Sequence, residues 1–269
     1  MIAKFIAFIF GSLIGSFLNV CIYRMPQSKS VVWPGSHCPL CEKRIPWYDN
    51  IPFASYIMLK GKCRFCNKLI SPVYLLVELL TAVMFVLLLD FYGLTYNFFV
   101  YVVFACLLII STFVDIKHRI IPDEVSLGGI VLGFILNSIR GFNLSPFGYN
   151  FRPMVNSLLG IVIGGGIIYL TGWLFDVIYF KLLKKPPIQG ETESMGGGDV
   201  KLLAMIGAFI GWPAAVLTFF LAPFFGAVVG IVNLVVKKDH TIPYGPFLAL
   251  AALLSLFWAN RIVGIILMR

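Results

Sequence analysis

Two aspartates in the second half of the chain lie where apolar sequence meets polar sequence. Asp115 ends the apolar run 100–114, and Asp199 follows three glycines and precedes the apolar run that begins at Val200. Two carboxylates brought close together cannot both ionise without a large free-energy cost, so such a pair shares one proton. The ionised member can activate water as a general base while the protonated member polarises a carbonyl group. The pattern is consistent with an aspartic dyad that hydrolyses a peptide bond.

The same two residues also have plain structural interpretations. An aspartate that ends an apolar helix is a common boundary residue, and an aspartate at the start of a helix commonly caps its N-terminus. The glycines at 196–198 allow close backbone approach and unusual dihedral angles just before Asp199. Spacing alone leaves the dyad and these alternatives open.

Four cysteines form two C-x-x-C pairs that are separated by 21 residues: Cys38 and Cys41, then Cys63 and Cys66. Each pair can offer two thiolates from one tight turn, and two such turns complete a tetrahedral Zn²⁺ site. Four protein ligands would close the site, so the zinc would be structural. Two disulfides or a redox pair are the alternatives, and a cytoplasmic location disfavours stable disulfides.

Composition indicates the setting of both clusters. The chain has 269 residues, of which 59% are hydrophobic and 12% charged, and its mean hydropathy is +0.93. A soluble domain typically has about 25% charged residues, and a disordered chain has low hydrophobicity. Several apolar runs reach the roughly 20 residues needed to cross a bilayer. We therefore expect an all-α polytopic membrane protein.

Eight transmembrane helices are predicted. The Gly211-Trp212-Pro213 sequence is expected to divide the long run 200–236 into two spans. The other six runs are 2–23, 73–91, 96–114, 124–140, 153–180 and 245–265. The predicted organisation is a first helix at 1–23, a small cytoplasmic zinc-binding insertion at 24–72, and a membrane domain at 73–269. Glu78, one turn inside its span, is expected to pair with a basic residue of the insertion.

The distribution of charge gives the orientation. Eight spans place sixteen of the 21 Lys and Arg residues on the side of the Cys-rich segment, which the positive-inside rule assigns to the cytoplasm. The net charge of +9 resides mainly in loops between apolar runs, and not on one soluble domain. Nucleic acid is therefore not expected as a partner, whereas the lipid bilayer is.

Five motifs in a fixed order suggest a family. They are Gly-Ser-Phe-Leu-Asn-Val at 15–20, the two C-x-x-C pairs, Val-Glu-Leu-Leu-Thr at 77–81, Asp115 with Ile-Pro at 121–122, and Gly-Gly-Gly-Asp-Val-Lys-Leu at 196–202. The chain resembles the type IV prepilin peptidases, which are aspartic proteases of the bacterial inner membrane. In many members the Ile-Pro is followed by Asn, whereas Asp123 stands here.

The resemblance implies a function. Asp115 and Asp199 match the two catalytic aspartates, and the substrates would be prepilins or pseudopilins whose basic leader is cleaved after a glycine at the cytoplasmic membrane face. The new N-terminal residue would then be methylated with S-adenosylmethionine as donor, at a site associated with the segment 24–72. The residues alone do not indicate where the methyl donor binds.

Four further acids flank the two aspartate segments: Asp123, Glu124, Glu191 and Glu193. On a face that is otherwise basic they could attract the Lys and Arg of a substrate leader and raise the encounter rate. Solvated loop acids are the alternative interpretation. Two other classes of function stay open on the sequence, namely an ion-coupled transporter and a non-enzymatic pilus or secretion assembly factor.

Overall fold

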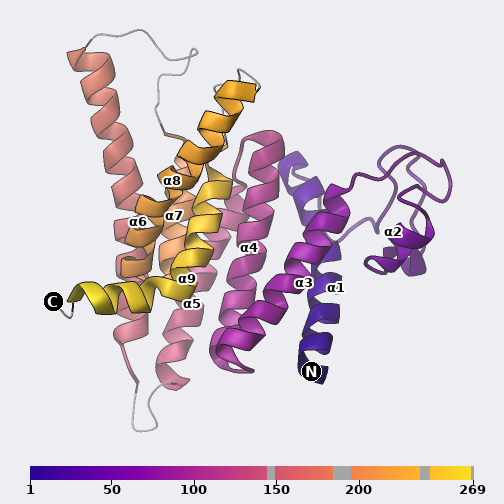
Figure 1. Ribbon diagram of the computed structural model, residues 1–269, viewed down its shortest axis with the longest axis horizontal. Helices are drawn as coiled ribbons and strands as arrows, with labels where there is room; N and C mark the ends of the chain where they lie inside the picture. The colour runs from indigo at the N-terminus through magenta and orange to yellow at the C-terminus, as the bar shows by residue number, and fades with distance from the viewer. Residues whose placement is uncertain (144–148, 184–194, 237–242, 268–269) are drawn as a thin grey trace. The chain divides into compact units, whose positions relative to one another are not determined.

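The computed structural model is built almost entirely of α-helices (Figure 1). It describes residues 1–143, 149–183, 195–236 and 243–267. Within these ranges there is no β-strand, and extended pairing is limited to two isolated bridges in the Cys-rich segment. The chain divides into two compact units, Met1–Val114 and Asp115–Arg269. The predicted all-helical class is confirmed.

The first unit combines long apolar helices with the short helical turns of the Cys-rich segment. In order, its elements are α1 (Ile2–Arg24), η1 (Met25–Gln27), η2 (Trp47–Asn50), α2 (Ala54–Met58), α3 (Val73–Tyr92) and most of α4 (Tyr96–His118). Helix α1 runs alongside α3 (Figure 1). A Cβ atom added at Gly11 or Gly15 would lie 2.8 Å from the Cα of Ala82 or Glu78, respectively. Small residues spaced by four therefore let the two helix backbones pack closely.

In the described residues, the second unit begins with the last turn of α4 and contains five further α-helices and one π-helical turn. They are α5 (Asp123–Asn143), α6 (Arg152–Asp176), which continues into the π-helical turn η3 (Val177–Leu182), α7 (Gly197–Ile210), α8 (Trp212–Val236) and α9 (Gly245–Leu267). Gly211 separates α7 from α8 with a φ of 80°, a conformation that favours glycine. The predicted division at Gly211-Trp212-Pro213 is confirmed.

Six helices in the described part of the chain are long and apolar enough to cross a membrane: Ile2–Gln27, Val73–Tyr92, Tyr96–His118, Asp123–Phe142, Arg152–Leu182 and Trp212–Ile231. These match six of the eight predicted spans. The other two fall on α7, which has 14 residues, and on α9, whose described apolar part is Gly245–Trp258. At 1.5 Å per residue, α7 spans about 21 Å of a hydrocarbon core about 30 Å thick. The count of eight therefore stays a prediction.

Helix α7 is the most deeply buried element of the second unit. Every residue from 202 to 209 is buried. It packs against both α5 and α6, and it meets α6 through glycine: a Cβ atom on Gly160 or on Gly207 would overlap the carbonyl group of the other. Only hydrogen can therefore occupy the side-chain position at either residue while the two backbones stay this close.

Side chains of α5 and α6 hold the C-terminal end of α7. The last carbonyl groups of a helix have no partner within it. Asn137 of α5 donates from Nδ2 to the carbonyl oxygens of Ala208 at 2.8 Å and Phe209 at 3.1 Å. Ser157 of α6 donates from Oγ to the Ala208 carbonyl at 2.7 Å. These contacts fix the helix that carries Asp199.

Candidate functional site

Asp115 and Asp199 come together in the second unit from two different helices. Asp115 lies in the last turn of α4 and is buried, with 6% of its surface exposed. Asp199 lies in the first turn of α7 and is half-buried. Their carboxylates are near enough for their charges to interact. The structure thus places the two sequence-predicted acids in one site.

Of the glycines before Asp199, Gly198 acts through close packing and not through dihedral freedom. Gly196 caps α7 with an extended φ of −66° and ψ of 135°, and the φ angles of Gly197 and Gly198 are not in the left-handed region. A Cβ atom at Gly198 would come within 3.3 Å of the Cβ of Ile121. The start of α7 therefore lies against the Ile-Pro sequence that precedes α5. Asp199 is three residues beyond the cap, so the interpretation of Asp199 as the N-cap is wrong.

The structure adds two residues that the sequence did not single out as functional. The backbone N–H of Gly245 donates to Oδ2 of Asp115 at 2.8 Å. Tyr244 is half-buried: burial raises the pKa of the Tyr244 phenol to about 12, and Asp199 is near enough for its charge to add to the rise. The phenol is therefore protonated at neutral pH. Pro-Tyr-Gly-Pro at 243–246 is a sequence typical of a turn, and its residue types carry no sign of a contact with Asp115 or Asp199.

Two of the four predicted leader-binding acids can be placed. Asp123 begins α5 and its carboxylate forms an ion pair with Nζ of Lys201 at 2.6 Å, which joins the starts of α5 and α7. Glu124 is exposed beside it. An exposed pair such as Asp123 with Lys201 contributes about 0–1 kcal/mol. Glu191 and Glu193 lie outside the described residues.

The four cysteines form one cluster in the first unit. The Sγ atoms of Cys38, Cys41, Cys63 and Cys66 all lie within 4.8 Å of one another. The Cys38 and Cys66 sulfurs are 4.0 Å apart, close to the separation of about 3.8 Å that tetrahedral geometry with Zn–S bonds of about 2.3 Å requires. None of the four is in a disulfide. The cluster could hold a metal ion.

The two halves of the cluster are the same turn, repeated after 25 residues. Cys38 N–H donates to the Lys43 carbonyl at 3.0 Å, and Cys63 N–H donates to the Lys68 carbonyl at 2.9 Å. The residue after each second cysteine has a left-handed backbone: φ is 57° at position 42 and 55° at position 67. In the second turn, the N–H groups of Cys66 and Phe65 lower the pKa of the Cys63 thiol to about 7. Each turn therefore presents two sulfurs to the same point.

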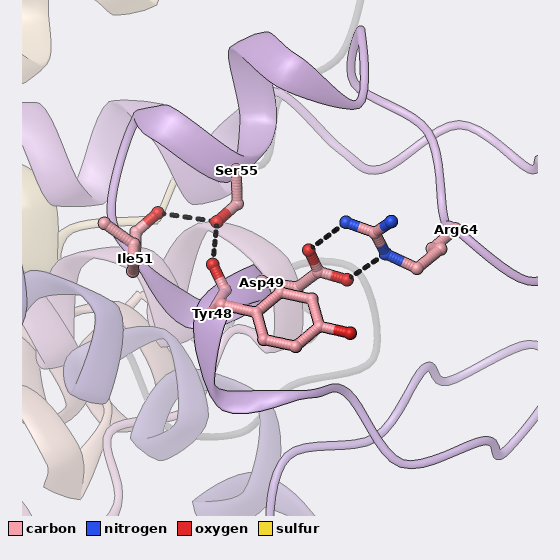
Figure 2. Close-up of polar contacts among 5 residues, drawn as sticks. All are labelled: Tyr48, Asp49, Ile51, Ser55 and Arg64. Carbon is pink, nitrogen blue, oxygen red and sulfur yellow. Dashed lines mark hydrogen bonds and ion pairs between the residues drawn. The ribbon is translucent and has the colours of Figure 1, made fainter.

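An ion pair fastens the segment between the two turns to the second of them (Figure 2). Arg64, inside the second C-x-x-C pair, donates to both carboxylate oxygens of Asp49 at 2.6 and 2.7 Å. The guanidinium holds the pKa of the Asp49 carboxyl below its usual range. Ser55 Oγ completes the arrangement by donating to the carbonyl oxygens of Tyr48 at 3.0 Å and Ile51 at 2.9 Å.

Glu78 connects the Cys-rich segment to α3. Its Oε2 accepts a hydrogen bond from the backbone N–H of Phe53 at 3.1 Å. Phe53 also stacks on Phe8 of α1, with ring centroids 5.8 Å apart. The sequence predicted a contact between Glu78 and this segment, but with a basic side chain. The observed donor is a backbone amide, which a pattern of residue types does not indicate.

Two family models match the chain in succession. The Bacterial Peptidase A24 N-terminal domain matches residues 9–91, which span most of α1, the Cys-rich segment and nearly all of α3. The Type IV leader peptidase family matches residues 102–231, which contain both Asp115 and Asp199. No solved structure matches the chain.

Curated relatives align over nearly the whole chain. A protein of Stutzerimonas stutzeri is 32% identical over 284 residues, which are 96% of this chain and 91% of that protein. A protein of Xanthomonas campestris pv. campestris is 33% identical over 94% of this chain and 90% of its own length, and one of Pseudomonas aeruginosa is 32% identical over 94% and 89%. All three are named prepilin leader peptidase/N-methyltransferase. The chain is a member of the Type IV leader peptidase family.

Proposed function

We propose that this protein is an intramembrane aspartic endopeptidase that removes the basic leader from prepilins or pseudopilins, with Asp115 and Asp199 as its catalytic dyad. The observation that carries the proposal is the meeting of two carboxylates, one ending α4 and one beginning α7, inside the region that matches the leader peptidase family. Removing an acid from water at the end of an apolar membrane helix costs free energy, so the buried Asp115 and the half-buried Asp199 point to a function.

The dyad would work by shared protonation. The ionised carboxylate takes a proton from water while the water oxygen bonds to the scissile carbonyl carbon. The protonated carboxyl gives its proton to the carbonyl oxygen, which stabilises the developing charge. When the tetrahedral intermediate collapses, the C–N bond breaks and the leaving amine takes the proton that the first carboxylate had accepted. As the carbonyl group reforms, a hydroxyl group of the intermediate gives its proton to the second carboxylate, so each acid ends in its own starting state.

The substrate's apolar helix would enter from the bilayer while its basic leader stays on the cytoplasmic side. The protein would lie in the bacterial inner membrane with the dyad and the Cys-rich segment facing the cytoplasm, as the distribution of Lys and Arg predicts. Of the four acids predicted to attract the leader, Glu124 is exposed and Asp123 is paired with Lys201. Glu124 would therefore contribute more than Asp123.

A second activity is proposed from the relatives. The curated relatives are named as N-methyltransferases as well as peptidases. The protein would transfer a methyl group from S-adenosylmethionine to the amine that cleavage exposes, with the segment 24–72 taking part. Zn²⁺ at the four cysteines would be structural, because all four ligand positions are supplied by the chain and no position is left for substrate.

The test is cleavage of a synthetic prepilin by the purified protein in detergent, followed by mass spectrometry. The wild type should release the leader, and with S-adenosylmethionine the mature peptide should gain the mass of one methyl group. Asp115→Asn and Asp199→Asn should each lower the cleavage rate by roughly 10²- to 10⁴-fold or more. The matched control is Asp90→Asn, since Asp90 is an exposed acid of α3 paired with Lys4. Cleavage at the wild-type rate by either dyad variant would falsify the assignment.

A further inference from the structure

In the first turn of α9, one backbone N–H group has no acceptor within the turn, and it donates to Asp115. The N–H groups of Phe247 and Leu248 both donate to the Tyr244 carbonyl, at 3.1 and 3.2 Å. Pro246 has no N–H. The N–H of Gly245 donates to Asp115 Oδ2 at 2.8 Å, within a buried contact. Asp115 therefore acts as the cap of α9, although 130 residues separate it from Gly245.

Gly245 is also a steric requirement of this contact. A Cβ atom built on Gly245 would lie 2.7 Å from Oδ2, 3.2 Å from Cγ and 3.3 Å from Cβ of Asp115. A separation of 2.7 Å is shorter than van der Waals contact, so the carboxylate or the start of α9 would have to move. Only glycine, which has no Cβ atom, therefore fits at position 245 while this contact stays as it is.

The turn at Tyr244 and Gly245 gives Asp115 and Asp199 different surroundings. Asp115 accepts a hydrogen bond from the positive N-terminal end of a helix, an environment that stabilises a negative charge. Asp199 is near enough to the half-buried Tyr244 for its charge to act on the neutral phenol. Besides Asp199, the charged group that acts on Asp115 is Arg119, one turn further along the chain, and its positive charge works in the same direction as the amide.

We propose that Tyr244 and Gly245 form a positioning turn that keeps Asp115 as the ionised member of the dyad, the general base, and leaves the shared proton on Asp199. The proposal rests on the proposed function and names the roles within it. The amide fixes one carboxylate oxygen of Asp115 and leaves the other free to take a proton from water. Asp199 then supplies the proton to the substrate carbonyl.

The experiment compares Gly245→Ala with Gly128→Ala in the full-length protein. A Cβ atom at Gly128, in α5 of the same unit, meets nothing within 4 Å. Initial cleavage rates of a synthetic prepilin are measured across a range of pH to give kcat and KM. Gly245→Ala should lower kcat at least tenfold with KM within threefold of wild type, whereas Gly128→Ala should match the wild type.

The pH profile separates positioning from simple damage. A donated hydrogen bond favours the ionised carboxylate, so weakening it makes Asp115 easier to protonate. A general base must be ionised, and the acid limb of kcat should therefore move to higher pH in Gly245→Ala. A shift of the basic limb instead would make Asp115 the acid and overturn the assignment of roles. A profile and rate equal to those of Gly128→Ala would overturn the positioning turn itself.

A second variant removes the donor without adding volume. Replacing the Tyr244–Gly245 amide by an ester, through incorporation of the hydroxy acid at position 245, exchanges the N–H for an oxygen. The acid limb should move in the same direction as in Gly245→Ala, and an unmoved limb would count against the proposal even if the alanine variant failed to fold. Cleavage by the wild type with no effect of either variant would refute this inference alone, whereas absence of cleavage by the wild type would refute the proposed function.

Discussion

Asn137 and Ser157 share one acceptor at the end of α7, so their replacement gives a double-mutant cycle with a defined sign. Both side chains donate to the Ala208 carbonyl oxygen, at 2.8 and 2.7 Å, and both are buried. In Asn137→Ala the carbonyl keeps Ser157, and in Ser157→Ala it keeps Asn137. In the double variant it loses both donors in a region closed to water.

The magnitudes follow from this count of donors. Hydrogen bonds between membrane helices contribute about 0.6 kcal/mol on average and about 1.7 kcal/mol at most. Ser157→Ala removes one bond and should cost about 0.6 kcal/mol. Asn137→Ala removes the bonds to Ala208 and Phe209 together and should cost about 1 to 2 kcal/mol. Leaving a buried carbonyl without a partner costs about 1–3 kcal/mol, so the double variant should exceed the sum of the single ones by about 1 kcal/mol.

The assay is reversible unfolding in mixed detergent micelles, with cleavage of a synthetic prepilin measured in parallel. The control is Ser138→Ala, because Ser138 Oγ donates at 2.8 Å only within its own helix, to Phe134, and its loss should change stability little. Since α7 carries Asp199, Asn137→Ala should also lower kcat severalfold. Strict additivity, or a larger loss for Ser157→Ala than for Asn137→Ala, would refute the reasoning.

Three further outcomes are expected. The purified protein should contain about one zinc ion per chain by elemental analysis, and Cys63→Ser should lose the metal and the protease resistance of the segment 24–72. Arg64 lowers the pKa of the Asp49 carboxyl, so this ion pair stabilises the segment 24–72 above about pH 4. The stabilisation is lost as the pH falls through the lowered pKa of Asp49. Asp49→Asn should therefore make unfolding of the segment less dependent on pH in acid. Asp115→Asn keeps an acceptor for the Gly245 amide and should unfold at the wild-type temperature while inactive, whereas Asp115→Ala loses the cap of α9 and should be less stable by about 1 kcal/mol in the same unfolding assay. Equal stability of the Asn and Ala variants would contradict the capping contact.

The parts of the fold that local sequence specifies are the parts that could be predicted. Apolar runs of sufficient length predicted the long helices, and Gly211 before Trp212 and Pro213 predicted the break between α7 and α8. The two C-x-x-C pairs predicted a common cluster because a turn of that spacing presents both sulfurs on one side. In each case the information lies within a few residues.

The contacts that complete the site depend on residues far apart in the chain. The Gly245 amide can donate to any acceptor, and nothing in Pro-Tyr-Gly-Pro names Asp115 as that acceptor. The same is true of Phe53, which meets Glu78 through its backbone. A charged residue in an apolar run shows in the sequence that it needs a partner. A backbone N–H is present at nearly every residue, so the sequence does not show which one is the partner. The glycines before Asp199 show the converse: residue type indicated a special backbone, but the contact observed is the close packing of Gly198 against Ile121.

The duplicated cysteine turns have a consequence for the chain between them. A metal bound by both turns would cross-link positions 38 and 66 and would make the 42–62 stretch a closed loop. The ends of such a loop stay together whatever happens in its middle. A protease that cut near Ile57 or Met58, which are 70% and 79% exposed, would therefore leave the two cysteine turns joined through the metal, and a chelator would release the turns from each other while α1 and α3 stay packed.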